Sequence, residues 1–367
     1  MKVAIFCFWL AGTLMVAATH QHAQQRKSSR RQRTQRVVPT PHKQAQHTDS
    51  QTQLVYPNGL TLNQAGDLYI SDIGTHRILK LDRRHQVTVI AGTGEAGFSG
   101  DQGPAVKAQL FAPHDLALDA EGHVLIADTY NHRVRRIDSQ GVITTVAGNG
   151  QAKYAGDNGS ALAASLNLPQ SIALDRDGNM LIADTYNYAV RRVDRQGTMT
   201  TFAGSVPGFA GDGGLANKAQ LSLPMAIAVA PDNSVYISDA GNSRVRRVGA
   251  DGKIQTLIGH GAGEGVYGAG FTGDGGPAEK AKIYSATDLE FDAAGDLYIS
   301  DSGNNRIRVV RAVIQPLSVR VNRAGGDAGQ ALAAELNTPQ KIAVDRDGQI
   351  FIADRANHRV RKVDKRV

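Results

Sequence analysis

The chain is poor in the residues that build a disulfide framework or a membrane-spanning protein. Its 367 residues include one cysteine, Cys7, and only 5% are aromatic. The longest apolar stretch, Val3 to Val16, is shorter than the ~20 residues that a helix needs to cross a bilayer. A body without cysteine must be stabilised by packing, without disulfides.

The first 18 residues have the pattern of a secretory signal peptide. Lys2 supplies the positive charge, Val3 to Val16 the apolar segment, and Ala17 and Ala18 the small residues that a signal peptidase prefers. We therefore expect cleavage, which gives a secreted or periplasmic mature chain that has lost Cys7. Anchoring through the uncleaved segment is the alternative.

Positive charge is confined to the start of the chain. The net charge is +7, and residues 1–50 contain eight basic side chains and one acidic one. Residues 51–367 are therefore neutral overall and attract a polyanion little, so we expect no nucleic-acid partner. Residues 19–50 are rich in Gln, Arg, Lys, Thr and His, which predicts a solvated linker. Adhesion of this basic tail to an anionic envelope polymer is the alternative.

Glycine is abundant, with 40 residues, and the sequence from residue 51 onward repeats one unit six times. Unit two has four strand-like runs, over residues 115–119, 123–128, 133–138 and 142–148, and tight Asp-x-x-Gly turns join such runs. Four antiparallel strands in each of six units predict an all-β, six-bladed β-propeller over residues 51–367. A solenoid is the alternative, but neither end offers the capping repeat that it needs. The units begin near Pro57, Pro113, Pro169, Pro224, Ala286 and Pro339.

Unit six stops after its third strand, which ends near Asp364. An open sheet edge invites pairing with another segment, so we expect an N-terminal segment to supply the missing strand and close the ring. The spacing of the other units favours Arg33–Val38, with Gln53–Tyr56 as the alternative.

A motif recurs where the second strand of each unit ends. In unit two it reads Ile126-Ala-Asp-Thr-Tyr-Asn-His-Arg-Val-Arg135, and unit one departs from it by Thr75 in place of Asn. These units resemble NHL repeats from residue 54 to the end. The Phe-x-Gly-Asp-x-Gly-x-Ala linkers are similar to those of exported bacterial NHL proteins and of the NHL region of teneurins. The resemblance implies a six-bladed propeller but no single function, because NHL propellers include protein-binding, RNA-binding and lyase domains.

Polar residues that recur in every unit predict structural roles. Each second strand ends in an aspartate, and an arginine follows five residues later except in unit three. We expect a buried Asp–Arg pair or an aspartate that caps the loop backbone, and we expect the linker aspartates to cap a short helical turn. The strand-end aspartates are Asp72, Asp128, Asp184, Asp239, Asp301 and Asp354. The arginines are Arg77, Arg133, Arg244, Arg306 and Arg359, and the linker aspartates are Asp101, Asp157, Asp212 and Asp274.

Residues that differ between units are the candidates for binding. The linkers and the loops between second and third strands emerge on one face of a propeller, and long loops on a rigid scaffold commonly bind ligands. The second and third residues of each inner strand are expected to surround the channel mouth on that face. A channel filled with water alone is the alternative. The predicted binding residues are Asn58, His114, Asp115, Gln170, Ser171, Thr287, Asp288, Gln340 and Lys341 at the mouth, with Tyr267 and Phe271 of the longest linker.

These features predict an exported, non-catalytic platform for a protein, peptide or glycan, without a cofactor. The alternative is a metal-dependent lyase or lactonase-like enzyme, with zinc or calcium held by His114, Asp115 and Asp288. RNA binding needs a basic face with stacking aromatics, and the scarcity of aromatics and the export signal argue against it. The third strands do offer a repeated arginine set: Arg135, Arg191, Arg246, Arg308 and Arg361.

The linker that leads into unit five is the longest and departs most from the others. We therefore expect specificity to lie there. Deletion of Glu264–Gly270 is expected to weaken partner capture and to leave the fold intact.

Overall fold

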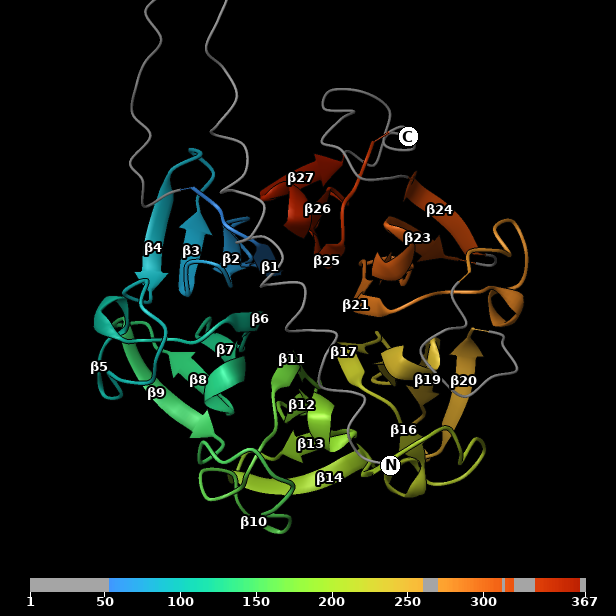
Figure 1. Cartoon of the computed structure of the whole chain (residues 1–367), viewed down its shortest axis with the longest axis horizontal. Coiled ribbons are helices and arrows are strands. Elements are labelled where there is room, and N and C mark those ends of the chain that lie inside the picture. The colour runs from blue at the N-terminus through green and yellow to red at the C-terminus, as the bar shows by residue number, and fades with distance from the viewer. Residues whose placement is uncertain (1–52, 260–269, 312–313, 320–333, 364–367) are drawn as a thin grey trace, which may run out of the picture. The chain divides into compact units, whose positions relative to one another are not determined.

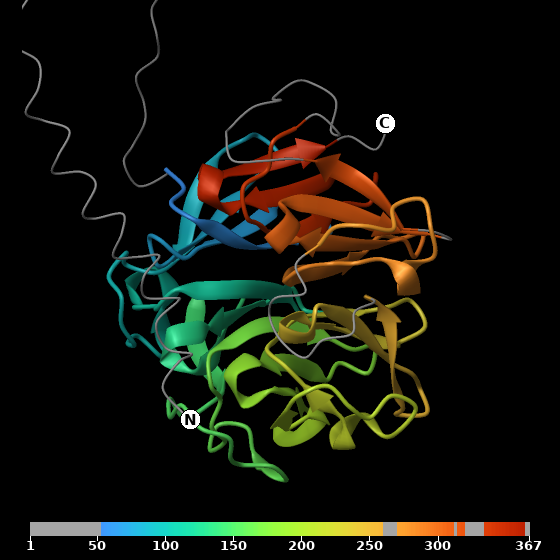
Figure 2. The same cartoon turned by 45° about the vertical axis from the view of Figure 1, so that its right-hand side comes forward.

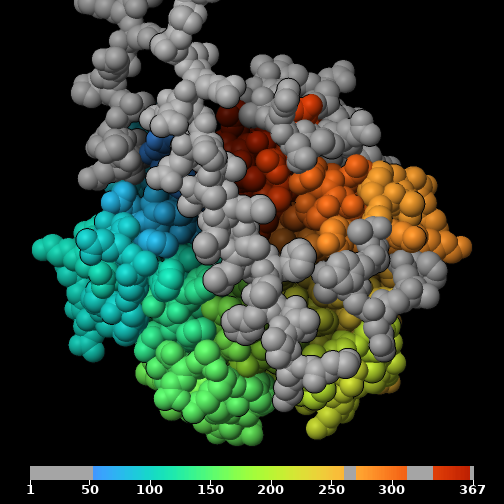
Figure 3. Space-filling model, viewed as in Figure 1, coloured from blue at the N-terminus to red at the C-terminus, as the bar shows by residue number. Residues whose placement is uncertain are grey.

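Six β-sheets follow one another around a central axis. The computed structural model describes residues 53–259, 270–311, 314–319 and 334–363. Figure 1 shows the sheets in chain order around the ring, and Figure 3 shows the same order as successive sectors of colour. This arrangement confirms the predicted all-β, six-bladed propeller. The predicted signal peptide, the basic linker, Arg33–Val38 and Tyr267 lie outside the described residues.

Each blade begins with a strand at the axis, as Figure 1 shows. These inner strands start at the residues where the six units start, and later strands of each blade lie progressively farther out. The inner strands are β1 (Pro57–Leu62), β6 (Pro113–Leu118), β11 (Pro169–Leu174), β17 (Pro224–Val229), β21 (Ala286–Phe291) and β25 (Pro339–Val344). The second strands are β2 (Leu68–Asp72), β7 (Val124–Asp128), β12 (Met180–Asp184), β18 (Val235–Asp239), β22 (Leu297–Asp301) and β26 (Ile350–Asp354).

Third and fourth strands complete the antiparallel sheets. The third strands are β3 (Arg77–Leu81), β8 (Arg133–Ile137), β13 (Ala189–Val193), β19 (Arg244–Val248), β23 (Arg306–Val310) and β27 (Arg359–Val363). The fourth strands are β4 (Val87–Ala91), β9 (Val142–Ala147), β14 (Thr198–Gly204), β20 (Ile254–Ile258) and β24 (Ile314–Val319). The second strands are buried along most of their length, whereas the third strands also contain partly exposed residues.

Linkers do more than connect blades, because two of them add a strand to the sheet that follows. β5 (Gly103–Pro104) pairs with β9 and β10 (Gly159–Ser160) pairs with β14, at the outer edge of blades two and three. Blades two and three thus have five strands, and blade six has three within the described residues. The prediction of four strands per blade missed these additions. The parallel pair β15 (Val206–Pro207) and β16 (Gln220–Leu221) lies in the next linker.

Apolar side chains fill the seams between blades. At the seam of blades one and two, Ile78 and Ala91 pack with Leu116 and Ile126, and the linker adds a buried cluster of its own. That cluster comes from the Ala-x-x-Ala-x-Leu pattern, as Ala105, Ala108 and Leu110. Short 3-10 turns carry the linkers and the loops between second and third strands. They include η1 (Ala105–Lys107), η2 (Thr129–Asn131), η3 (Thr185–Asn187), η7 (Ser302–Asn304) and η9 (Arg355–Asn357). Within the described residues no helix is both long and apolar enough to span a bilayer.

Blade six packs beside blade one, as both cartoon views show (Figures 1 and 2). Gln53–Tyr56 does not form the fourth strand of blade six, since the described sheet of that blade contains only β25, β26 and β27. The Tyr56 N–H instead donates to Nδ1 of His358 over 3.3 Å, and the two rings lie 4.5 Å apart. The alternative closing strand was therefore wrong, because this segment is held by a loop contact rather than a sheet edge.

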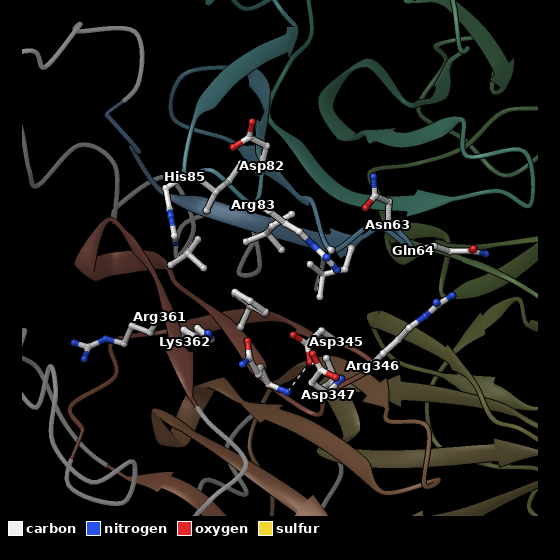
Figure 4. Close-up of a pocket in the computed structure, with 18 residues that line it drawn as sticks. Asn63, Gln64, Asp82, Arg83, His85, Asp345, Arg346, Asp347, Arg361 and Lys362 are labelled. Carbon is white, nitrogen blue, oxygen red and sulfur yellow. Dashed lines mark hydrogen bonds between the residues drawn. The ribbon is translucent and has the colours of Figure 1, made fainter.

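The seam between blades six and one retains a groove of about 660 Å³. Leu62, Leu81 and Phe351 are among its apolar walls. Figure 4 shows Arg83 of blade one and Asp345 of blade six on opposite sides of this groove. At the four seams between blades one and five, linker alanines take part in the packing, whereas here the described residues include only Leu54 of the preceding segment.

Candidate functional site

The strand-end aspartates are the centre of a repeated polar cluster, which we call the perimeter lock. In blade two, Oδ1 of Asp128 accepts the Phe111 N–H over 2.8 Å, and Oδ2 accepts the Asn131 amide over 2.8 Å and an Arg135 N–H over 3.4 Å. The Arg135 guanidinium is fully buried and also pairs with Asp101 at 2.7 Å. The aspartate therefore ties the linker, the loop and the third strand together.

The arginine of the lock is seven residues from the aspartate, not five as predicted. The equivalent pairs are Asp184–Arg191, Asp239–Arg246, Asp301–Arg308 and Asp354–Arg361. Arg133 instead donates to the carbonyls of Asn131 and Asn149, and its guanidinium lies 3.7 Å from the centre of the Phe98 ring. Arg133 and Arg135 lie on the same side of the strand, and only the more deeply buried Arg135 reaches the Asp128 carboxylate.

The linker aspartates were also predicted wrongly. The 3-10 turn η1 follows Pro104 and has no side-chain cap. Asp101 pairs with Arg135 and accepts the Thr145 hydroxyl over 2.6 Å, so it extends the lock outward. Of the repeated arginine set, Arg135, Arg191, Arg246 and Arg308 have no exposed surface and so are not available to contact RNA.

Burial has an electrostatic consequence in the lock. It raises the pKa of Asp128 to about 6, while the Phe111 N–H, Asn131 and Arg135 act in the opposite direction. Blade one differs, because Leu79 stands where the other blades have the buried arginine. There Asp72 accepts the Val55 N–H and the Thr75 hydroxyl, and burial raises its pKa to about 6 as well.

The phenylalanine of three linkers belongs to the same polar cluster. Phe98, Phe209 and Phe271 lie over Arg133, Arg244 and Arg306, with guanidinium-to-ring distances of 3.7, 3.9 and 3.2 Å. The predicted binding residue Phe271 thus repeats a contact found in other blades. Its partner in that prediction, Tyr267, lies outside the described residues.

The third residues of the inner strands meet across the axis in one charged group, which we call the axial cluster. The Lys341 ammonium of blade six lies 2.9 Å from Asp115 of blade two and 2.8 Å from Asp288 of blade five, and 3.2 Å from the Ser171 hydroxyl of blade three. All four side chains are buried. The cluster connects four blades through the centre of the ring and occurs once in the described chain.

Both aspartates of the axial cluster have further partners. Asp115 accepts the N–H groups of Leu116 and Ile172, and Asp288 accepts the N–H of Ile342 over 2.6 Å. Burial raises the pKa of Asp288 to about 6, although Lys341 opposes the shift. Burial works against the charge on Lys341, but Asp115 and Asp288 outweigh it and raise its pKa above the ordinary value. Lys341 therefore stays cationic.

The second residues of the inner strands form the mouth on the side of the long loops. The Asn58 amide donates to the His114 carbonyl over 2.7 Å, and both residues are buried. Burial lowers the pKa of His114 to about 3, so its ring is neutral. The Thr287 hydroxyl is hydrogen-bonded to the Ser302 hydroxyl and to the Pro339 carbonyl. Gln170 and Gln340 are half-buried, and they are the predicted mouth residues best placed to meet a ligand.

Sequence reasoning missed an aromatic group beside this mouth. Phe111 stacks on Tyr130 with centroids 5.0 Å apart, and His76 meets Phe111 edge-on at 5.6 Å. Tyr186 occupies the equivalent place in blade three, and Tyr130 and Tyr186 are 41% and 37% exposed. The signal was present, since this loop position reads Gly74, Tyr130, Tyr186, Gly241, Gly303 and Ala356 around the ring.

The metal site of the enzyme alternative competes with the axial cluster. Asp115 and Asp288 already share the Lys341 ammonium, which stands where a cation would be needed. Within the described residues, the group with metal-ligand spacing is Asp119, Glu121 and His123, in the first hairpin of blade two on the opposite face. Asp119 there bonds His123 and the hairpin backbone, which is an ordinary turn role.

Comparison with known proteins agrees with this geometry. The family model of the teneurin NHL domain matches residues 59–155 and 205–249, and the NHL repeat model matches residues 336–363. The protein is an NHL-repeat propeller. Among its relatives, teneurin-4 of Mus musculus is 28% identical over 349 residues, which covers 85% of this chain and 12% of the teneurin. NHL repeat-containing protein 2 of Gallus gallus is 24% identical over 85% of this chain and 46% of its own length.

The NHL propeller is also similar to solved structures. A protein of unknown function from Bacteroides thetaiotaomicron has a TM-score of 0.60 and 17% identity, covering 84% of this chain and 69% of its own. An auxiliary nutrient binding protein from the same organism has a TM-score of 0.59 and 16% identity, with the same coverage. At these identities the likeness shows the fold alone. The chain spans less than half the length of the two relatives named above.

Proposed function

We propose that this NHL propeller is an exported, non-catalytic platform that binds a protein, peptide or glycan on the face of its long loops. The observation that carries the proposal is the location of exposed apolar side chains. In the described residues, all the large ones except Val87 belong to linkers or to loops between second and third strands. They are Phe98, Phe111, Tyr130, Tyr154, Tyr186, Val206 and Phe209, together with Val106, Leu162 and Leu215 where the linkers pass the hairpins between third and fourth strands.

The aromatic group of blades two and three is the part of this surface best suited to recognition. Tyrosine offers a large rigid face with a polar end, at a low cost in conformational entropy. Tyr130 and Tyr186 break the symmetry of the ring, since the equivalent residues of the other blades are glycine or alanine. Beside them lies the half-buried Gln170, whose amide can both donate and accept. A peptide backbone or a sugar ring matches this combination.

The perimeter locks support binding by holding these loops in place. Asn131 joins η2 to Asp128 and to the Gly97 carbonyl over 2.7 Å, and Asn187 does the same for η3 through Asp184 and the Lys153 carbonyl. A preorganised loop loses less conformational entropy when a ligand binds. The tyrosines thus project from fixed turns.

Peptide and glycan arrays probed with the mature protein test the proposal, followed by titration of the selected ligand. Tyr130→Ala with Tyr186→Ala places at both positions the residue that blade six has at Ala356. We expect this variant to fold and to lose at least about tenfold in affinity. Leu215→Ala, at an exposed linker position farther from the mouth, is the matched control and should bind as the wild type does. Equal binding by both variants would contradict the proposal.

Two further experiments address the alternatives. Elemental analysis of protein purified from the exported fraction, without chelators, should find no stoichiometric metal; bound zinc or calcium would favour the lyase or lactonase alternative. Deletion of Glu264–Gly270, which falls mostly outside the described residues, stays a prediction. It should fold and bind more weakly, and an unfolded product would contradict it.

A further inference from the structure

A cavity of about 310 Å³ lies in the channel between the axial cluster and the hairpin face. The axial cluster forms one end, and the last residues of the inner strands, such as Leu62 and Val344, form the other. The fifth residue of each inner strand contributes to the wall. Five of these six residues are small and leave the space open: Thr61, Ala117, Ala173, Ala228 and Ala343. The sixth is Glu290.

Glu290 is the one carboxyl group of this cavity with oxygens to spare. Within the described residues no hydrogen bond or ion pair to its carboxyl group is found, and the residue is half-buried with its exposure toward the channel. Asp115 and Asp288, in contrast, have Lys341 and backbone N–H groups as partners. Like the mouth tyrosines, Glu290 differs from its equivalents in the other blades, but it lies on the other side of Lys341.

We propose that this cavity binds a small organic molecule through a primary ammonium group that pairs with Glu290. The fixed charges favour a cation, since two aspartates and one lysine leave an excess of negative charge before Glu290 is counted. An ammonium group suits the site better than a metal ion, because divalent metals need several oxygen ligands and Glu290 alone has free oxygens. Lys341 already shows an ammonium group held by carboxylates at the adjoining level of the channel. The inference is independent of the loop face.

The electrostatics of the cavity couple this binding to a proton. Burial raises the pKa of Glu290 to about 8, Asp288 and Asp115 add to the shift, and Lys341 opposes it. Near neutral pH the empty site therefore holds a proton on Glu290. An entering ammonium favours the ionised carboxylate, so the proton leaves as the ligand arrives. Affinity should rise with pH until Glu290 is ionised in the empty protein.

Calorimetric titration with a series of linear alkylammonium chlorides, from ethyl to hexyl, tests the inference on the mature protein. The titration is run at about pH 7 in phosphate and in HEPES, neither of which is a primary amine, because a proton released to the buffer makes the observed enthalpy depend on the buffer. We expect saturable binding, release of close to one proton per ligand, and tighter binding at about pH 9. Calcium chloride and zinc chloride should bind more weakly than the best amine, and 1-butanol should not bind.

Two variants separate Glu290 from the rest of the cavity. Glu290→Gln should abolish proton release and weaken amine binding by about tenfold or more, as loss of a buried charge partner does. Glu290→Ala reproduces the residue of blades two, three, four and six and should fold even if the glutamine variant does not. The inference would be overturned by the absence of saturable amine binding, by equal binding to both variants and the wild type, or by stronger binding of a metal or of 1-butanol.

Discussion

The perimeter locks and the axial cluster are both buried ion pairs of aspartate with a basic residue, but they differ in how often they occur. The buried Asp–Arg pair recurs in five blades, whereas the buried Lys341–Asp115–Asp288 group occurs once in the described chain. A lock joins neighbouring segments of one blade and its linker, and the axial cluster joins blades on different sides of the ring. Contacts that repeat from blade to blade thus hold the individual blades together, whereas residues that depart from the repeat join distant blades or are candidates for binding.

Removing a lock arginine should give the largest effect. Arg191→Ala leaves Asp184 buried without its cationic partner and also removes the cation that pairs with Asp157. We expect a loss of about 3–5 kcal/mol in the free energy of unfolding, since breaking a buried ion pair strands a charge. Equilibrium denaturation measures it.

A matched variant sharpens this test. Arg191→Leu with Asn187→Thr transfers to blade three the arrangement of blade one, where Leu79 and Thr75 accompany Asp72. It should lose less stability than Arg191→Ala, because the leucine fills the space. Equal losses would mean that blade one is not a working variant of the lock.

The second-largest loss of stability is expected in the axial cluster. Lys341→Met should destabilise the propeller by about 3 kcal/mol, because two buried carboxylates then face each other without a cation. The triple variant that adds Asp115→Asn and Asp288→Asn removes those charges and should recover most of the loss. Thermal unfolding of the wild type, Lys341→Met and the triple variant measures these differences. Failure of the triple variant to recover would show that the cluster acts through packing and not charge.

A smaller effect is expected from the histidines that join neighbouring blades. Nδ1 of His76 accepts the Ala112 N–H over 3.2 Å and Nδ1 of His132 accepts the Leu168 N–H over 3.1 Å, which requires the neutral ring. Burial lowers the pKa of both below the ordinary 6.5. The unfolded chain therefore takes up protons first, and stability falls as the pH drops below that value, by about 1 kcal/mol for each histidine.

Asparagine provides the control for this pH effect. In blade five, Asn305 Oδ1 accepts the Thr338 N–H over 2.8 Å at the same position and does not titrate. His76→Asn with His132→Asn should keep the contacts and lose less stability between about pH 6.5 and pH 5 than the wild type. Titration of the aspartates is common to both proteins, so the difference isolates the histidines. Identical pH profiles would rule out this role.

The smallest change in stability is expected at the mouth tyrosines. Tyr130→Ala and Tyr186→Ala should each shift the free energy of unfolding by no more than about 0.5 kcal/mol, as exposed substitutions usually do. Chemical denaturation checks this beside the binding titration. A loss comparable to that of the locks would assign these residues to folding instead.

Features that follow from the repeat period could be predicted from the sequence, whereas contacts between distant blades could not. The repeat placed the inner strands, and register placed Asp115, Asp288 and Lys341 at one level of the channel. That Lys341 reaches both aspartates depends on the diameter of the closed ring, which no local pattern encodes. Arg133 was assigned to Asp128 because an arginine recurs five residues after the strand-end aspartate, and it is indeed the cross-strand neighbour. Its guanidinium nevertheless reaches loop carbonyls and leaves the carboxylate to Arg135. Tyr130 and Tyr186 were overlooked because they lie inside a repeated motif.

Hydrogen–deuterium exchange of the mature protein, with and without its array-selected ligand, tests most directly the claim that binding resides where the loop face breaks symmetry. The account predicts protection of the loop segments 110–112, 129–132 and 185–188, where Phe111, Tyr130 and Tyr186 lie. Protection confined to the opposite-face hairpins, such as residues 119–123, with those loops unchanged, would contradict it.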